Sequence, residues 1–543
     1  MRTDPRLRAA YSEGAGIYRI IPAGVALPRS IADLQALVEW ARGTGTPLVP
    51  RGAGSGIPGN AVGPGVIVDL RERMSRVLEV DKASATAVTS ANVTLADLNR
   101  SAEAVGLRLP PDPSSAAWAT LGGMVATNAA GARSVRYGPV RPWVIGMEVV
   151  TADGELGWFS RGETSSPPVG QETRGPALPA AIDRLHRLTV PLIRGRAELI
   201  RERFPKVRKN TAGYALDQWL RSGDDLDLLI GAEGTLALVT AIRWQLDPIP
   251  RARTGLRVAL RSLDDLEEAV TAIVALEPSA VELLDRTFLD LLTPAGHGGE
   301  GPALPEGSEA VLLVEFERDK AARARAATAD AARALRSLAT DVTAALTRDE
   351  EHRLWRLRHA ASPILASLPA DRRSLQVIED GCVPLPRLGE YVRLIRRTAD
   401  RLRITAVIFG HAGDGNIHVN AISQLNEPDW AERVQQLYTE VNAAAIQLGG
   451  TVSGEHGDGR LRAPLLEALY GSEIVELFAG VKTAFDPDGI FNPGVKLAPD
   501  APALTRLKLG PDAAAIPDDV AAALRDIERT GGYARSRVEI AEG

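Results

Sequence analysis

The chain has 543 residues, of which 45% are apolar and 24% are charged, and its net charge is −6 at pH 7. This length predicts two or three domains, and the composition is typical of a globular protein. The absence of a long basic run argues against a nucleic-acid partner. The N-terminus lacks the apolar core of a secretory signal, and no stretch approaches the 18 apolar residues of a membrane span. A cytoplasmic location is expected, with peripheral association at the inner face of the membrane left open.

The N-terminal half alternates helix and strand patterns around glycine-rich loops. Residues 31–43 have apolar spacing that predicts a helix ending at Gly43. Thr94 is expected to cap a second helix. The remaining expectations here are buried strands at 65–70 and 228–240, a strand with a hairpin turn at 146–155, and an exposed insertion at about 160–180.

Beyond a predicted domain boundary near residue 250, the pattern alternates again. LRVALRS predicts a strand, LDDLEEAVTAIVAL a helix and VLLVEFE another strand. Residues 319–347 are rich in Ala, Arg and Asp at helical spacing, which predicts one solvated helix. The tail from about residue 498 is rich in Ala, Pro and Asp and carries no recognisable chemistry. The whole pattern is that of a mixed α/β and α+β protein.

Cys382 is the only cysteine of the chain. It excludes an intramolecular disulfide, a cysteine-ligated iron–sulfur cluster and a zinc finger within this chain. A bound metal would therefore need histidine and carboxylate ligands.

Two glycine-rich loops lie in the N-terminal half. In PRGAGSGIPGN (residues 50–60), the glycines let backbone N–H groups approach an anion, and Ser55 adds a hydroxyl donor. This loop is neither a P-loop nor a G-x-G-x-x-G fingerprint, and a plain turn is the alternative. The second loop, residues 110–140, contains Gly122-Gly123, and its alternative is a buried small-residue helix at 119–126. Together they predict backbone facing a large, flat, charged ligand.

The order of these motifs resembles the flavin-binding oxidoreductases related to vanillyl-alcohol oxidase. It continues through KNTAGY (209–214), GAEGTLALVT, FGHAGDGNIHVN (409–420), SGEHGDG (453–459) and FDPDGIFNPGVKL (485–497). Within that group the chain is similar to the D-2-hydroxyacid dehydrogenases, which act on D-lactate, glycolate or D-2-hydroxyglutarate. The resemblance covers about residues 15–497. It implies an α+β fold with a two-subdomain FAD-binding domain (1–247), an α+β cap or substrate domain (248–445), a C-terminal segment completing the flavin site (446–497), and a tail (498–543).

The resemblance also implies which residues bind FAD. The pyrophosphate would lie on Gly52, Ala53, Gly54, Ser55 and Gly56. Further FAD contacts would come from Pro113, Ser114, Thr120, Gly122, Gly123, Asn128, Gly131 and Asn492, with Glu233, Gly234 and Val239 near the adenine. Ala53 and Met124 depart from the family pattern, at positions where backbone contacts can survive the change. Relatives with covalently linked FAD use a histidine of the first loop, which this chain lacks, so non-covalent FAD is expected.

Two histidines flank the turn in FGHAGDGNIHVN. Asp414-Gly415 is a two-residue hairpin signal, and counting outward from it pairs His411 with His418, with Asn420 on the same face. Glu455 of SGEHGDG could add a carboxylate, which gives a two-histidine, one-carboxylate metal set. Two hairpins with local hydrogen bonds are the alternative. The resemblance implies a divalent metal, such as Zn or Mn, on His411, His418 and Glu455.

His456 is the candidate general base, because imidazole titrates near neutral pH. The substrate hydride would then pass to flavin N5. Arg358 matches the family arginine that binds the substrate carboxylate, Ser362 matches the hydroxyl position after it, and Asn420 is a further substrate contact. Arg356 is more simply an exposed charge on a helix. Dehydrogenases of dicarboxylic substrates carry a lysine near Ile378 or Glu379, so D-lactate, glycolate or a larger monocarboxylic hydroxyacid is favoured.

Without cysteine-bound clusters, the electrons must pass from FAD to a quinone, an electron-transfer protein, a separate iron–sulfur subunit or oxygen. Three other functions remain as alternatives at this point. One is a metallohydrolase without flavin, which would leave the glycine loops unexplained. The others are an alcohol or sugar oxidase of the same fold and a catalytically silent flavin-binding subunit of a larger redox complex.

Overall fold

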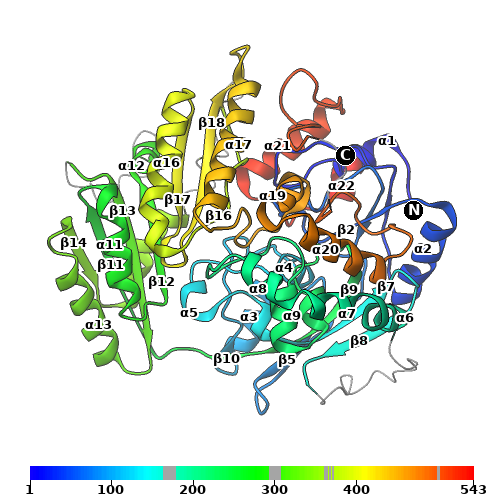
Figure 1. The fold of residues 1–543 in the computed structure, drawn as a ribbon, viewed down its shortest axis with the longest axis horizontal. Helices are drawn as coiled ribbons and strands as arrows, with labels where there is room; N and C mark the ends of the chain where they lie inside the picture. The colour runs from blue at the N-terminus through cyan, green and yellow to red at the C-terminus, as the bar shows by residue number, and fades with distance from the viewer. Residues whose placement is uncertain (163–178, 293–306, 360–364, 366–367, 370–371, 498–501) are drawn as a thin grey trace.

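The computed structural model describes residues 1–162, 179–292, 307–359, 365, 368–369, 372–497 and 502–543 (Figure 1). The N-terminal half holds a parallel three-stranded sheet, β1 (Gly24–Ala26), β3 (Val66–Asp69) and β2 (Leu48–Arg51), in that order. It also holds an antiparallel five-stranded sheet in the order β4-β5-β9-β7-β8. These strands are β4 (Leu78–Asp81), β5 (Thr86–Ser90), β9 (Ala237–Gln245), β7 (Val144–Thr151) and β8 (Leu156–Ser160).

Most predicted elements of this half are confirmed. Helix α2 (Ile31–Thr44) starts at its Ser30 cap, but it runs through Gly43 and ends before Gly45, whose φ of 67° closes it. Thr94 caps α3 (Leu95–Glu103) by accepting the Asp97 N–H. The small-residue helix exists as α4 (Leu121–Thr127). The expected insertion lies almost wholly outside the described residues.

The buried strand expected at 228–240 is wrong in its first part. Residues Leu226–Leu229 form helix α10, and β9 starts only at Ala237. Between them Gly231, Glu233 and Gly234 all have positive φ, which turns the chain. The glycines therefore mark a turn that leads into the strand.

The C-terminal half contains an antiparallel sheet in the order β14-β11-β13-β12-β17-β18-β15, and β16 also pairs with β18. Its strands are β11 (Ala252–Leu260), β12 (Ala280–Asp285), β13 (Ala310–Arg318), β14 (Ala339–Ala345), β15 (Arg372–Leu375), β16 (Gly381–Cys382), β17 (Thr405–His411) and β18 (Asn416–Gln424). The single helix expected over 319–347 is wrong: α13 (Ala321–Ala334) is followed by β14, whose Thr and Val residues suit its pairing with β11.

One face of this sheet is apolar and the other carries charge. Leu312, Val314 and Phe316 of β13 share a core with α11 (Leu266–Val274), α13, α16 (Leu388–Arg401) and α17 (Trp430–Gln447). Side chains of a strand alternate between faces, so Glu315 and Glu317 of the same strand point away from these helices. This second face looks toward the N-terminal half.

Further α-helices and strands of the described residues connect or flank these sheets. They are α1 (Pro5–Ala10), β6 (Leu107–Arg108), α5 (Ser134–Tyr137), α6 (Ala180–Arg184), α7 (Val190–Gly195), α8 (Ala197–Arg203), α9 (Leu216–Ser222), β10 (Asp247–Pro248), α12 (Arg286–Leu292), α14 (Arg348–His359), α18 (Gly459–Arg462), α19 (Leu466–Tyr470) and α20 (Ser472–Phe485). Among the described helices, none combines the length and apolar character needed to cross a bilayer.

The tail is folded, although its sequence suggested no role. Helices α21 (Asp518–Thr530) and α22 (Arg537–Glu542) pack beside α1, so the two chain ends lie close together in Figure 1. Val520, Leu524 and Ile527 of α21 share a buried cluster with Val49 and Ile67 of the parallel sheet. The tail thus supports the strand that leads into the first glycine loop.

Buried ion pairs join the two halves. Arg133 donates to both carboxylate oxygens of Glu315 at 2.9 and 2.8 Å, and Arg108 donates to both oxygens of Glu317 at 3.0 and 2.7 Å. Burial alone would raise the pKa of Glu315, but the Arg133 guanidinium outweighs it and holds that pKa far below its usual range. The charged face of the sheet is therefore held against the N-terminal half by matched charges.

Replacing one of these carboxylates should destabilise the protein strongly. Glu317→Gln leaves Arg108 and Arg253 without their shared counter-ion in a buried setting, and we expect a loss of about 3–5 kcal/mol in the free energy of unfolding. Urea unfolding followed by circular dichroism measures it. Asp290→Asn, which breaks the exposed Arg286–Asp290 pair, is the control and should cost at most about 0.5 kcal/mol. Equal losses for both variants would contradict the role of burial.

Candidate active site

The histidine hairpin is formed by β17 and β18, but with a different register from the one expected. His411 pairs with Asn416 and His418 pairs with Phe409, because Ala412–Asp414 form a 3₁₀ turn that ends at Gly415. Gly415 has φ 74°, and a Cβ there would lie 2.1 Å from the Val383 carbonyl oxygen. The predicted pairing of His411 with His418 is therefore wrong. The observed register differs from the expected one by two residues, and an even shift leaves each side chain on the same face of the sheet. The rings of His411 and His418 therefore still lie together, with their centroids 4.9 Å apart.

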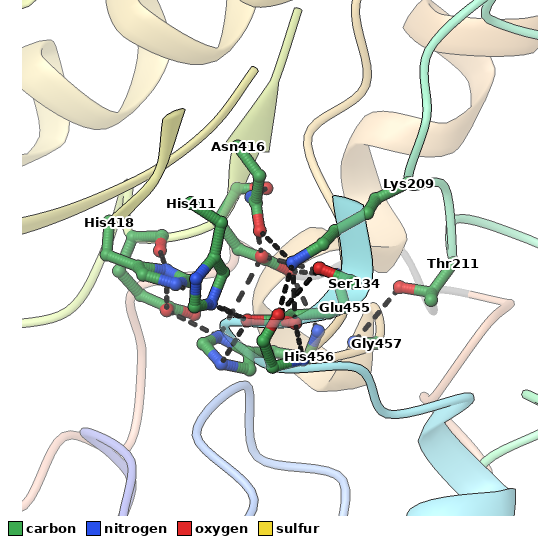
Figure 2. Close-up of polar contacts among 12 residues, drawn as sticks. Ser134, Lys209, Thr211, His411, Asn416, His418, Glu455, His456 and Gly457 are labelled. Atoms are coloured by element: carbon green, nitrogen blue, oxygen red, sulfur yellow. Dashed lines mark hydrogen bonds and ion pairs between the residues drawn. The ribbon is translucent and has the colours of Figure 1, made fainter. Parts of the chain in front are cut away.

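Glu455 lies between the two halves and faces both histidines (Figure 2). Its Oε1 is 2.8 Å from His411 Nε2 and 3.4 Å from His418 Nε2. Its Oε2 accepts the Gly131 N–H at 2.8 Å and the Lys209 ammonium at 2.9 Å. Burial opposes ionisation of this carboxyl, but Lys209 and His411 outweigh it and hold the pKa of Glu455 well below its usual range.

The orientation of both rings is fixed from behind. His411 Nδ1 donates to Glu282 Oε1 at 2.6 Å, and His418 Nδ1 donates to the Glu379 carbonyl at 2.7 Å. Each Nε2 is thereby turned toward Glu455 Oε1, and one ligand atom from each of the three residues lies within 4.8 Å of the others. Histidines held through the second nitrogen are typical of metal sites.

Burial acts in the same direction on the pKa of both histidines, but the net shifts are opposite. It would lower the pKa of His411, but the carboxylate of Glu282 outweighs it and raises that pKa to about 9. For His418 burial dominates, and its pKa is lowered. The donor set of two imidazoles and one carboxylate therefore fits a divalent cation, which would bind the deprotonated forms.

His456 is the most accessible histidine of the group. Its ring stacks on His418 with centroids 5.1 Å apart, and its side chain is 28% exposed, against 5% and 6% for His411 and His418. Its Nδ1 donates to Glu379 Oε2 at 2.6 Å, and Arg462 pairs with the other oxygen of Glu379. Although burial would lower the pKa of His456, Glu379 raises it to about 9. The Nε2 atom is left on the side away from Glu379.

The structure places two of the three predicted substrate-binding residues, Arg358 and Asn420, near the histidines. Arg358 lies over the Phe409 ring and donates its Nε–H to Glu282 Oε2 at 2.6 Å, so Glu282 links it to His411. Asn420 accepts the Ser374 hydroxyl at 2.7 Å. Ser362 lies outside the described residues. Arg356 is exposed on α14, as its simpler interpretation required.

A cavity of about 680 Å³ runs from these residues to the first glycine loop. Arg358 and Asn420 line it, together with the histidine group, which is His411, His418, Glu455 and His456. Its volume is typical of a cofactor or small-molecule site. The walls come from both halves of the chain and from the tail.

Comparison with known proteins identifies the group to which the chain belongs. Residues 22–160 match the model described as "FAD binding domain", and residues 249–495 match "FAD linked oxidases, C-terminal domain". The chain is 31% identical to glycolate oxidase subunit GlcD of Bacillus subtilis, with 89% of this chain and 91% of the relative covered. It is also 31% identical to D-lactate dehydrogenase of Archaeoglobus fulgidus, over 87% and 90% of the two chains. The chain belongs to the FAD-linked oxidase family.

Solved structures support the fold of this FAD-linked oxidoreductase. 4-Ethylphenol oxidase from Gulosibacter chungangensis has a TM-score of 0.66 at 17% identity, covering 92% of this chain and 94% of its own. p-Cresol methylhydroxylase has a TM-score of 0.65 at 13% identity, covering 92% and 93%. The predicted α+β fold of the vanillyl-alcohol oxidase type, and the predicted flavin-dependent oxidoreductase, are confirmed.

The first glycine loop fits a flavin nucleotide. Within the described part of the chain, the N–H groups of Ala53, Gly54, Ser55 and Gly56 have no hydrogen-bond acceptor, so they are available to an anion. A Cβ on Gly52 would lie 2.3 Å from Thr120 Oγ1, and Gly54 has φ 71°. Glycine is required at these positions because a side chain would clash or strain the backbone, and its absence leaves the backbone N–H groups accessible.

Most residues expected to bind FAD line the cavity. They are Gly52, Ala53, Gly54, Ser55, Gly56, Pro113, Ser114, Thr120, Gly122, Gly123, Gly131, Glu233, Gly234 and Val239. Asn128 instead ends α4 with φ 51°, and Asn492 is buried and donates to the carbonyls of Asn60 and Glu233. The Glu233 carboxylate accepts the N–H groups of Asp458 and Gly459, so it supports that loop.

Three charged residues of the site were not predicted. Lys209 lies in the recognised KNTAGY motif, but its contact with Glu455 spans 246 positions. Glu282 lies between apolar residues in the middle of the buried strand β12, and a buried acid at such a position could have indicated a functional role. Glu379 was considered only as the place of a missing lysine.

A side chain in the first glycine loop should prevent flavin binding. Gly52→Ala places its Cβ against Thr120 Oγ1 and displaces the backbone that faces the cavity. We expect the ratio of flavin to protein absorbance to fall to less than about a tenth of that of the wild type. Gly43→Ala is the control, because a Cβ there meets nothing within 4 Å and alanine favours the α2 helix. Full flavin content in Gly52→Ala would show that this loop does not hold the cofactor.

Proposed function

We propose that this flavoprotein is a dehydrogenase that oxidises a D-2-hydroxyacid to the 2-oxoacid. The observation that carries the proposal is the convergence of His411, His418, Glu455 and His456 on one end of the flavin cavity. Relatives named glycolate oxidase subunit and D-lactate dehydrogenase, similar over most of their length, support it. Bound FAD would supply the hydride acceptor at N5.

A divalent cation such as Zn²⁺ or Mn²⁺ would bind His411 Nε2, His418 Nε2 and Glu455 Oε1. The two imidazoles are already oriented by Glu282 and the Glu379 carbonyl, and Lys209 occupies only the other oxygen of Glu455. Such a cation would displace the proton from His411. It would also polarise the substrate hydroxyl and lower the pKa of that group.

His456 is the proposed general base. Glu379 accepts its Nδ1–H, so Nε2 is the atom that would take the hydroxyl proton. Because the pKa of His456 is raised to about 9, the form with a free Nε2 lone pair increases as the pH rises toward that value. Arg462 neutralises Glu379 from behind. Glu379 is therefore a positioning residue, comparable in role to the acid that orients a catalytic histidine.

Substrate recognition is proposed for Arg358, Asn420 and Ser362. The absence of a lysine near Ile378 or Glu379 favours a monocarboxylic acid, because a second substrate carboxylate would lack its cationic partner. D-2-Hydroxyglutarate dehydrogenase of Escherichia coli is 29% identical to this chain, which spans 50% of that relative's length. D-Lactate, glycolate or a larger monocarboxylic hydroxyacid is the proposed substrate class.

The remaining proposals concern the flavin and its reoxidation. The first glycine loop, residues 50–60, has no histidine to form a covalent link, which supports non-covalent FAD. The chain's single cysteine, Cys382, is buried and free, so no cysteine-ligated cluster accepts the electrons here. A quinone, an electron-transfer protein or a separate iron–sulfur subunit is the proposed acceptor.

Flavin reduction without oxygen tests the reaction directly. We expect D-lactate or glycolate to bleach the flavin absorbance in a stopped-flow instrument, and L-lactate and D-2-hydroxyglutarate to do so much more slowly. His456→Gln should lower the reduction rate by about 10²–10⁴-fold, with the flavin content unchanged. No bleaching by any 2-hydroxyacid would refute the proposal, and equal rates for D-lactate and D-2-hydroxyglutarate would refute the substrate class.

The metal can be tested by removal and by substitution. A chelator should abolish flavin reduction, and Zn²⁺ or Mn²⁺ should restore it, because the cation orients the substrate. His418→Ala should lose the metal measured by elemental analysis and keep FAD, since the ring of His418 contacts Glu379 and Glu455 and not the glycine loop. Active protein without stoichiometric metal would exclude the cation from the mechanism.

A further inference from the structure

The segment 528–533 at the end of α21 lines the cavity, although neither matching family model extends beyond residue 495. Glu528, Thr530, Gly531 and Tyr533 all belong to the cavity wall. They lie between the first glycine loop and the strand that carries Ser374. This wall is contributed by the part of the chain that had no expected role.

One end of the segment is tied to the N-terminal half. Arg71, just beyond β3, donates to the carbonyl oxygens of Tyr533, at 2.8 Å, and Ala534. The next residue, Glu72, accepts the Ser536 hydroxyl at 2.7 Å. Since β3 is the central strand of the parallel sheet, these bonds hold the tail to the sheet whose neighbouring strand leads into the glycine loop.

The other end is tied to the C-terminal sheet. Arg373 of β15 donates to Glu528 Oε2 at 3.1 Å, and Lys508 lies 3.4 Å from Glu528 Oε1. Burial would raise the pKa of Glu528, but Lys508 and Arg373 outweigh it and lower that pKa. The segment therefore bridges the two halves across the cavity.

An aromatic pair completes the wall. The Tyr533 ring lies 6.0 Å from the Trp118 ring, which follows Ser114 in the second glycine-rich loop. Gly531 has φ 68°, and a Cβ on it would lie 3.1 Å from the Trp118 indole. Tyr533 and Trp118 both line the cavity, so their apolar surface is available to a bound group.

The tail also adds positive charge near the glycine loop. Arg537 of α22 is buried, and its Nη1 has no hydrogen-bond partner among the described residues. Burial and the neighbouring guanidinium of Arg51 together lower the pKa of Arg537 to about 9. Arg51 itself lines the cavity. An anion on the loop would relieve this repulsion.

We propose that residues 528–533 are part of the FAD site and form its outer wall, which retains the nucleotide half of the cofactor. The bridge from Arg373 to Arg71 closes the cavity beside the loop that would hold the diphosphate, and Tyr533 with Trp118 provides the apolar contact. This inference rests on the family's flavin and not on the proposed substrate. It holds whether or not the protein oxidises hydroxyacids.

The rate of FAD release tests the wall. Holoprotein is diluted, and the recovery of flavin fluorescence is followed over time, without any substrate. We expect Tyr533→Ala and Arg71→Met to release FAD at least about tenfold faster than the wild type. Glu528→Gln, which removes a charge and keeps the shape, should also accelerate release. Asp526→Ala, which breaks an exposed pair on the same helix but lies outside the segment, is the matched control and should release FAD at the wild-type rate.

Thermal unfolding separates a cofactor wall from a merely structural tail. Bound FAD raises the Tm of the wild-type protein. A variant that loses only cofactor contacts should show a smaller increase on FAD binding, while the Tm of its apoprotein stays at the wild-type value. If Tyr533→Ala fails to accumulate, the near-isosteric Glu528→Gln takes its place in both measurements. The proposal is overturned if these variants release FAD at the wild-type rate. It is equally overturned if a substitution lowers the Tm of the apoprotein and of the holoprotein by the same amount, because the wall would then make no contribution to FAD binding.

Discussion

A buried carboxylate must be surrounded by hydrogen-bond donors or positive charges. Glu455, buried between the N-terminal half and the C-terminal sheet, takes these partners from both. Its two oxygens face a lysine and a backbone N–H of the N-terminal half on one side and two histidines of the C-terminal sheet on the other. None of these groups could stay in place if the halves separated. The burial of one charge therefore fixes the position of the sheet relative to the flavin loops.

The charged face of the C-terminal sheet extends this logic. Glu282, Glu315 and Glu317 all alternate with apolar residues that pack under the helices. Glu315 and Glu317 pair with arginines of the other half, and Glu282 divides its oxygens between His411 and Arg358. The same sheet face thus serves as interface and as active-site wall, which explains why the site forms where the two halves meet.

Local signals in the sequence predicted the local structure well, and long-range contacts explain what they missed. The Thr94 cap, the strand β13 and the glycine loops follow from neighbouring residues alone. The hairpin register was wrong because Ala412–Asp414 turn as a 3₁₀ segment, yet the histidines stayed on one face since strand side chains have a period of two. The roles of Lys209, Glu379 and the tail depend on contacts with residues far away in the sequence. The spacing of residues in the sequence does not reveal such contacts. The family resemblance correctly implied the flavin, it is the source of the proposed metal ligands, and it covers residues only to about 497.

The placement of the tail has a consequence for biosynthesis. Domains usually fold as they leave the ribosome, in order from the N-terminus. Here the glycine loop near residue 52 is translated early, while the cavity wall at Tyr533 emerges some 480 residues later. The nascent chain can therefore form both sheets before the cofactor cavity is closed. With the proposed role of this wall, firm capture of flavin would be a late event of maturation, and a ribosome that stalls near the 3′ end of the message would release a nearly full-length chain with an open site.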